Sequence, residues 1–293
     1  MFKYYLYKFG QFCVNRLSLR TAYRIAMLLS DLHYLWSPRD CRAVHHNLQA
    51  IAHNSDNLHK RSREVFRNFG KYLVEFFRMS QEVNQDFIKQ HVKVSNLDRL
   101  EQVLQRGKGG IILTAHIGNW ELGGVILSTL GYPSMAIALP HKERPVNDLF
   151  NRQRESRGML IVQINQAVRR CLETLRDNKL VAVLADRDFT ASGEVINFLG
   201  RDTLIPKGAA IFAAKTGAGI IPTFLVREGE DQFHLFLEEP IYPPQECEGE
   251  VTLEVLVPII KKYAAVIEEK VRQYPTQWLM FREFWVKNNT RPA

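Results

Sequence analysis

His116 and Glu121 are the residues of this chain whose types and spacing are best suited to catalysis. His116 follows the apolar run 111–115, and Gly118 and Asn119 lie between it and Glu121. In one continuous helix, residues five apart lie about 140° apart around the axis and would not meet. On a strand-to-helix turn, with backbone freedom at Gly118 and Asn119 as N-cap, the pair can touch. The carboxylate would then orient the imidazole, which would deprotonate a hydroxyl.

The sequence around His116 offers no nucleophile of its own. No serine or cysteine is close to it in the sequence, and no Gly-x-Ser-x-Gly elbow is present. The hydroxyl would therefore belong to a substrate that attacks an activated acyl group directly, without an acyl-enzyme. Two other interpretations stay open. His116 can be a structural histidine with Glu121 as a helix N-terminal charge, or the pair can activate water in a hydrolase.

Two sequence regimes meet at about residue 90. Residues 1–90 favour helices at 3–34, 38–53 and 58–79, because apolar residues recur there at helical spacing. From residue 91, short apolar runs alternate with amphipathic segments, which indicates an α/β fold with a mostly parallel central sheet and helices on both faces. We therefore expect an N-terminal helical, membrane-associating region, 1–90, and one continuous catalytic core, 91–293. The strands are predicted at 92–94, 109–115, 135–139, 159–164, 180–185, 219–226 and 233–238, and the helices of the core at 97–105, 119–130, 145–157, 167–177, 207–216 and 251–273.

The charge of the chain is concentrated at its N-terminus. The 293 residues carry a formal net charge of +8, and residues 1–90 hold fourteen Lys and Arg against seven Asp and Glu. Phe, Tyr, Leu and Trp interleave with cations over the first 36 residues, which is typical of a helix in a bilayer interface. Packing of an amphipathic helix on its own domain explains the pattern equally well. The charges are too frequent for a signal peptide or a spanning helix.

Cysteines and histidines give no indication of a metal or redox site. The four cysteines are widely spaced without a Cys-x-x-Cys pair, which suits a reducing compartment and predicts neither zinc nor a disulfide framework. His45 and His46 have no partner at metal-ligand spacing. Gly217 and Gly219 do not form a dinucleotide fingerprint. We expect no metal and no bound cofactor.

The segment His116-Ile117-Gly118-Asn119-Trp120-Glu121 resembles the His-x4-Asp/Glu motif of the glycerolipid acyltransferase superfamily. It is most similar to the bacterial branch of late lipid A acyltransferases, the lauroyl/myristoyl type. This branch often has Asp-Gln where this chain has Asp186-Arg187, and many members begin with a membrane-spanning helix. Further matching segments follow in order over most of the chain: Arg144-Pro145, Asp186-Arg187-Asp188, Asn197-Phe198-Leu199-Gly200-Arg201, Pro206-x-Gly208, Ile221-Pro222 and Pro275-Thr276-Gln277-Trp278.

The resemblance implies an acyltransferase that moves a fatty acyl group from an acyl carrier protein or coenzyme A thioester to a lipid hydroxyl. His116 would be the base, Glu121 would orient it, and Arg154 or Arg152 would stabilise the oxyanion. The favoured acceptor is a lipid A precursor, and the alternatives are a lysophospholipid, a phosphoinositol mannoside or an ornithine lipid. The candidate substrate contacts are Asn119, Arg144, Arg152, Asp186, Arg187, Arg201 and Lys207.

The resemblance also implies where such an enzyme would act and what it would meet. Its partners would be the thioester donor, the lipid acceptor and the membrane surface, and not nucleic acid. Its location would be the cytoplasmic face of the inner membrane, with peripheral or N-terminal attachment. The alternative from another class is a non-enzymatic basic membrane-binding protein, which would not need a paired base and orienting acid.

Overall fold

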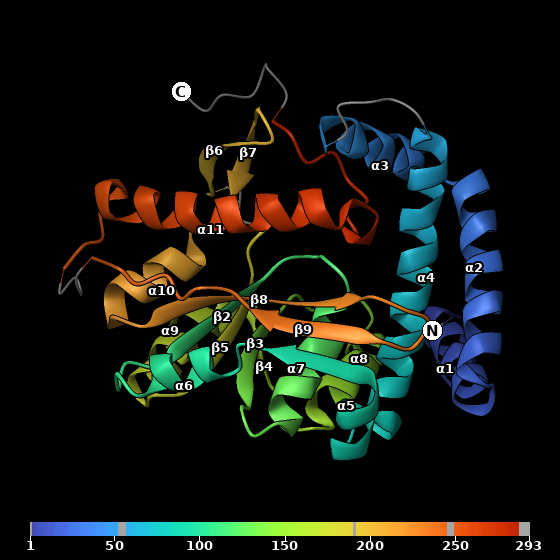
Figure 1. Cartoon of the computed structure of the whole chain (residues 1–293), viewed down its shortest axis with the longest axis horizontal. Coiled ribbons are helices and arrows are strands. Elements are labelled where there is room, and N and C mark those ends of the chain that lie inside the picture. The colour runs from blue at the N-terminus through green and yellow to red at the C-terminus, as the bar shows by residue number, and fades with distance from the viewer. Residues whose placement is uncertain (1, 52–56, 190–191, 245–248, 287–293) are drawn as a thin grey trace.

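A seven-stranded sheet lies at the centre of the computed structural model, which describes residues 2–51, 57–189, 192–244 and 249–286 (Figure 1). The strand order is β1-β9-β8-β2-β5-β3-β4, and every neighbouring pair is parallel except β8 and β9. This confirms the α/β fold with a mostly parallel sheet. The strands are β1 (Val92–Ser95), β2 (Gly110–Thr114), β3 (Ser134–Ala138), β4 (Leu160–Gln163), β5 (Leu180–Leu184), β8 (Gly219–Arg227) and β9 (Phe233–Leu237).

The two faces of the sheet are covered by different helices, because successive side chains of a strand point to opposite faces. On β2, Ile111 and Leu113 belong to one hydrophobic cluster, whereas Ile112 belongs to another. The first cluster includes α9 (Ile164–Arg176), α10 (Gly208–Thr216) and α11 (Leu253–Gln273). The second includes α6 (Asp98–Leu104), α7 (Trp120–Thr129) and α8 (Arg144–Glu155). Figure 1 shows α11 along one side of the sheet and α7 and α8 on the other.

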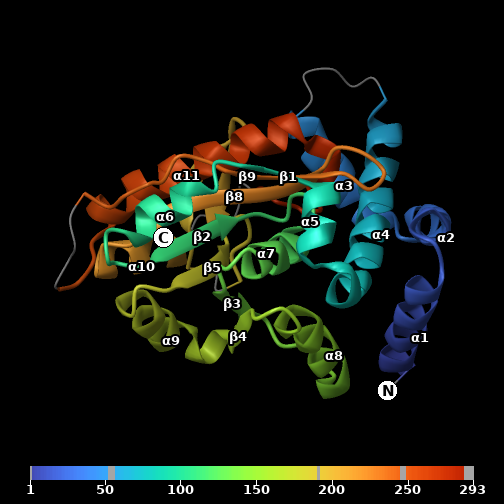
Figure 2. The same cartoon turned by 60° about the horizontal axis from the view of Figure 1, so that its bottom comes forward.

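The N-terminal helices stack at one end of the sheet (Figures 1 and 2). They are α1 (Phe2–Arg16), α2 (Leu19–Trp36), α3 (Pro38–Ile51), α4 (Leu58–Glu82) and α5 (Gln85–His91). The single helix predicted over 3–34 is wrong, because the chain breaks before α2, where Ser18 accepts a hydrogen bond from the Thr21 amide. Residues 52–53, predicted to end the second helix, lie outside the described residues.

The helix α4 is integrated into the α/β core rather than standing apart from it. Val65, Phe66 and Tyr72 share a hydrophobic cluster with the sheet, and Tyr72 stacks on Trp120 of α7 with ring centroids 4.7 Å apart. Among the described residues, no helix is both long and apolar enough to cross a membrane.

Three features have no counterpart in the sequence-based prediction, and the first is the helix α5, which follows α4. An antiparallel hairpin, β6 (Glu194–Phe198) and β7 (Arg201–Ile205), turns at Leu199 and Gly200, both of which have positive φ. The C-terminal segment after α11 passes through a short 3-10 helix (Pro275–Gln277) and buries Trp278, Phe284 and Trp285 in the first cluster. This segment returns the C-terminal part of the described chain to the turn that carries His116.

Candidate active site

The turn between β2 and α7 carries His116 and is held from two sides. Gly118 has φ +63°, and a Cβ at this position would lie 2.0 Å from the carbonyl oxygen of Leu225 on β8. The Gly118 amide donates to the carbonyl of Gln277 at 2.9 Å, and the Asn119 amide donates to that of Leu225 at 2.9 Å. The predicted strand-to-helix turn, with its need for glycine at position 118, is confirmed.

Asp186 is the hydrogen-bond partner of His116. Its Oδ1 lies 2.7 Å from Nδ1 of the imidazole, and its Oδ2 accepts from the His116 amide at 2.9 Å. The indole Nε1 of Trp278 donates to the same Oδ2 at 3.1 Å. Asp186 lies two residues after the end of β5, which is the parallel neighbour of β2, so both residues lie at the carboxyl edge of the sheet. The carboxylate thus has three donors and fixes the ring from one side.

The electrostatics of the site keep Asp186 ionised. Its side chain is fully buried, and burial alone would raise its pKa. The neighbouring His116 charge and the hydrogen bonds from His116 and Trp278 outweigh that effect and lower the pKa below the usual range of an aspartic acid. A buried carboxylate that accepts from Nδ1 leaves Nε2 as the ring nitrogen for proton transfer.

Glu121 does not orient His116 in the structure, and the predicted pairing is corrected. Its carboxylate forms a bidentate ion pair with Arg154 of α8, with Nε to Oε2 at 2.8 Å and Nη2 to Oε1 at 2.6 Å. Among the described residues, no hydrogen bond joins Glu121 to His116. A planar guanidinium and a carboxylate commonly pair through two parallel hydrogen bonds. Glu121 is therefore placed to fix Arg154, and not to fix His116.

Asn119 is a structural residue of the turn rather than an open substrate contact. It is 2% exposed, its Oδ1 caps α7 by accepting from the Leu122 amide, and its Nδ2 donates to Glu75 of α4 at 2.7 Å. Glu75 also accepts from the Tyr23 hydroxyl of α2 at 2.6 Å and from Nε of Arg227 at 2.7 Å. This buried network, which the sequence did not reveal, ties α2 and α4 to the His116 turn.

A cavity of about 620 Å³ opens beside His116 and is lined mainly by apolar side chains. His116, Glu121 and Arg154 lie together on its wall, and the imidazole contacts the Trp120 ring edge-on with centroids 4.7 Å apart. Small and apolar residues of β2, β3, β5 and α10 continue the wall away from these polar groups. Four large apolar side chains of the lining are also solvent-exposed and mark the mouth: Leu139, Ile164, Val168 and Phe189.

The other predicted substrate contacts divide into two groups. Arg187 and Lys207 line the cavity. Arg144 and Arg152 are exposed on α8 and do not line it. Arg201 is also exposed outside the cavity, where Nη1 contacts Nε2 of His46 at 3.2 Å and the guanidinium lies over the Trp285 ring. Asp186, predicted as a substrate contact, is instead the partner of His116.

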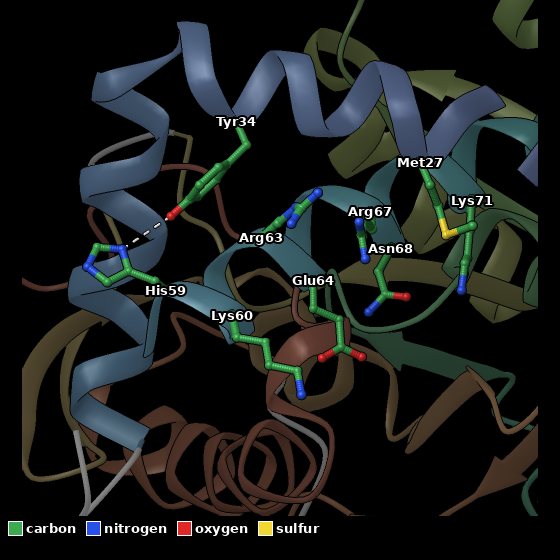
Figure 3. A pocket seen from close by; sticks show the side chains of 9 residues that line it. All are labelled: Met27, Tyr34, His59, Lys60, Arg63, Glu64, Arg67, Asn68 and Lys71. Carbon is green, nitrogen blue, oxygen red and sulfur yellow. Dashed lines mark hydrogen bonds between the residues drawn. The ribbon is translucent and has the colours of Figure 1, made fainter. Parts of the chain in front are cut away.

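A second cavity of about 620 Å³ lies between α2 and α4 and is basic (Figure 3). Lys60, Arg63, Arg67 and Lys71 follow one another along α4, opposite residues of α2. Arg63 and Arg67 each form two hydrogen bonds with the carboxylate of Asp31. These ion pairs connect α2 to α4, so the arginines have a structural role here.

Comparison with known proteins bears on the chemistry of this site. Residues 2–287 match the family described as bacterial lipid A biosynthesis acyltransferase. The chain belongs to this family. It is therefore an acyltransferase, and the resemblance seen in the sequence motifs is confirmed.

Characterised relatives of this acyltransferase fall into two groups by the lipid in their names. Phosphatidylinositol mannoside acyltransferase of Mycobacterium tuberculosis (strain H37Rv) is 26% identical over 224 residues, 75% of this chain and 68% of the relative. The protein of the same name from Mycolicibacterium smegmatis is 26% identical over 228 residues, 76% of this chain and 72% of the relative. Lipid A biosynthesis palmitoleoyltransferase of Escherichia coli K12 is 22% identical over 248 residues, which are 82% of this chain and 75% of the relative.

Proposed function

We propose that this acyltransferase moves a fatty acyl chain from an acyl carrier protein or coenzyme A thioester to a hydroxyl of a lipid, with His116 as general base. The observation that carries the proposal is the 2.7 Å contact between Nδ1 of His116 and Asp186 on the wall of a largely apolar cavity. The contact leaves Nε2 as the proton acceptor. Asp186 therefore takes the orienting role that the sequence motif suggested for Glu121.

The reaction proceeds by direct attack of the acceptor. Nε2 of His116 takes the hydroxyl proton while the acceptor oxygen forms a bond to the thioester carbonyl carbon, and the carbonyl π electrons move to oxygen. Collapse of this tetrahedral intermediate breaks the carbon–sulfur bond. The departing thiolate receives the proton from Nε2, which returns His116 to its starting state. The products are an ester and a thiol, and no acyl-enzyme is formed.

Arg154 is the cation that stabilises the oxyanion in this mechanism. Its side chain is 13% exposed and lies on the cavity wall with His116. Nε and Nη2 are committed to Glu121, which fixes the plane of the guanidinium. Nη1 donates one long hydrogen bond to Oδ1 of Asn151 at 3.4 Å, and its second N–H is the donor toward developing charge. A positioned cation in an apolar cavity acts strongly on charge that appears only in the transition state. Glu121 is then a positioning residue for Arg154.

The apolar part of the cavity suits the acyl chain. Its wall is built from residues such as Ile112, Ala136, Ala182 and Phe212, which offer no hydrogen bonds to a polar substrate. The exposed apolar rim would let a lipid enter directly from a bilayer rather than through water. Neither a metal nor a bound cofactor is needed, because the thioester itself supplies the activated acyl group.

Exposed apolar faces on α1 and α2 support a location at a membrane surface. Ile25, Leu28, Leu32 and Leu35 recur along α2 at helical spacing, and Trp36 is 79% exposed. On α1, Tyr5, Leu6, Phe9 and Phe12 are exposed in the same way. Apolar patches flanked by cations are typical of helices lying in a bilayer interface. We therefore propose peripheral or N-terminal attachment to the cytoplasmic face of the inner membrane.

Two acceptors are supported by the comparisons. A lipid A precursor is the first, because the family match extends over residues 2–287. A phosphatidylinositol mannoside is the second, because relatives named for that lipid are 26% identical to this chain. The test is incubation of the purified protein with a palmitoyl thioester and each lipid, followed by mass spectrometry. One added acyl ester on either lipid supports the proposal and names the acceptor. Release of free palmitate with neither lipid acylated would support a hydrolase instead.

A further inference from the structure

Arg187 places an unpaired positive charge on the wall of the active-site cavity. It directly follows Asp186, the partner of His116, and its guanidinium lies 4.3 Å from the ring centroid of Phe189. Within the described part of the chain, the guanidinium has no ion pair, and its buried Nε has no hydrogen-bond partner. Leaving a buried donor of a charged group unsatisfied is costly. The arrangement therefore indicates a partner that comes from outside the chain.

Arg282 adds a second cation to the same place. Its guanidinium lies 5.9 Å from the same Phe189 centroid. Two effects lower the pKa of Arg187 to about 10: burial first, and then the positive charge of Arg282. The two cations therefore repel each other. No side-chain ion pair of Arg282 occurs among the described residues. Two neighbouring guanidinium groups without a shared carboxylate form a site of net positive charge.

The nearby carboxylates are occupied elsewhere. Asp186 is held by His116 and Trp278, and Asp188, which also lines the cavity, accepts from the Gly193 amide at 2.8 Å. Lys207 lies on the same cavity wall and adds to the positive potential. The planar guanidinium group of arginine presents paired N–H donors that match the spacing of two phosphate oxygens.

We infer that Arg187 and Arg282 form a binding site for a phosphate group of one of the two substrates, beside the base His116. This inference rests on the proposed function for the identity of those substrates. The phosphate belongs to the acceptor headgroup or to the phosphopantetheine arm of the donor. In both cases the site would anchor the polar end of a substrate while its acyl chain occupies the apolar cavity.

The first test is direct binding and needs no turnover. Calorimetry would compare dodecyl phosphate with uncharged dodecyl glucoside, both below their micelle concentrations, on the wild type and on Arg187→Gln, Arg282→Gln and Arg176→Gln. Arg176 is exposed at the end of α9 and serves as a matched loss of charge. We expect the wild type and Arg176→Gln to prefer the phosphate, and Arg187→Gln to bind it about 10- to 100-fold more weakly. An unchanged preference in Arg187→Gln, or an equal loss in Arg176→Gln, would overturn the inference.

The second test identifies the substrate that carries the phosphate. If Arg187→Gln raises KM for a phosphorylated acceptor about tenfold with little change in kcat, the site holds the acceptor. If it raises KM for palmitoyl-CoA but not for the phosphate-free S-palmitoyl-N-acetylcysteamine, the site holds the donor. Unchanged KM values for all substrates would contradict the site. If the wild type itself shows no acyl transfer but still binds dodecyl phosphate through Arg187, the result would uphold the site and refute the proposed function.

Folding of the test variant is checked separately. Because Arg187→Gln removes no ion pair among the described residues and only the contact with the Phe189 ring, it should melt close to the wild type. Dodecyl phosphate should raise the melting temperature of the wild type and of Arg176→Gln but not that of Arg187→Gln. A clear drop in melting temperature for Arg187→Gln without ligand would show that the arginine is structural and would count against the site.

Discussion

His116 and Asp186 are 70 residues apart in sequence, yet their side chains meet at 2.7 Å because β2 and β5 are parallel neighbours. The contact uses the carboxyl ends of two adjacent strands, where polar residues of open α/β sheets commonly converge. It makes Asp186, rather than Glu121, the residue that controls the imidazole.

Replacement of Asp186 by Asn should reduce kcat strongly. The amide cannot stabilise the imidazolium, and its NH2 group can face Nδ1 and favour the wrong tautomer, so we expect a loss of ~10²–10⁴-fold. The measurement is kcat for acyl transfer by the purified variant. Asp177→Asn removes a carboxylate of an exposed surface ion pair and is the control. Wild-type kcat in Asp186→Asn would remove Asp186 from the mechanism.

Loss of Glu121 should act through Arg154. Glu121→Ala leaves a mostly buried guanidinium without its carboxylate, which is expected to destabilise the fold by ~3–5 kcal/mol and to lower kcat. If the pair acts as a unit, Glu121→Ala and Arg154→Ala combined should cost much less than the sum of the single losses. Denaturant unfolding and kcat of the four proteins give the coupling. Additive effects on kcat would mean that Glu121 acts independently of Arg154.

Gly118 should tolerate no side chain. Gly118→Ala would place Cβ 2.0 Å from the Leu225 carbonyl oxygen at φ +63°, so both crowding and backbone strain oppose it. Gly131→Ala is the matched control, since Gly131 also has positive φ but nothing within 4 Å of an added Cβ. Thermal melting should show a much larger loss for Gly118→Ala, together with loss of transfer. Equal losses would show that strain alone, and not the contact with β8, sets the requirement.

Asp31 should make the stability of the N-terminal helices sensitive to acid. Hydrogen bonds from Arg67 and Arg63 lower its pKa well below the usual value of an aspartic acid. A lowered folded-state pKa gives stability that is present above the unfolded-state pKa of ~3.9 and is lost as the pH falls toward the folded value. Asp31→Asn should therefore have a lower melting temperature than the wild type at pH 7, and the difference between the two melting temperatures should become smaller below about pH 4. A difference that does not change with pH would contradict this assignment.

The apolar face of α2 should bind lipid. Leu28→Glu combined with Leu35→Glu places two charges on that face, and sedimentation with vesicles of mixed zwitterionic and anionic phospholipid should show binding reduced by about tenfold or more. Leu253→Glu, at a similarly exposed leucine at the start of α11, is the control. Unchanged vesicle binding in the α2 double variant would exclude this face as the contact.

Local signals in the sequence predicted most elements of the core, because the strands and helices there have their own periodicity and several have a glycine or proline at a boundary. The hairpin of β6 and β7 escaped prediction, since its turn places Leu199 at positive φ, which a non-glycine residue rarely adopts. The break between α1 and α2 was signalled only by Ser18, a single N-cap inside a helical pattern.

The site was only partly predictable for the same reason. The His116 turn is local and was recognised from Gly118 and Asn119. The partner of His116 depends on which strands are neighbours, and strand order is not encoded in spacing. Spacing alone predicts Glu121, the acid close to His116 in the sequence, whereas Asp186 follows the adjacent strand 70 residues away. Glu75 and Arg227 belong to distant elements, and their pairing with the turn follows only from the packing of α4 on the sheet.

The most direct test of the central claim is the rate of acyl transfer by His116→Ala, measured with the purified protein, a palmitoyl thioester and the acylated lipid as the product detected. With folding confirmed by an unchanged circular dichroism spectrum and melting transition, the account predicts that transfer falls by at least ~10³-fold, because the variant lacks the imidazole that takes the hydroxyl proton. Transfer within a few-fold of the wild type would contradict it.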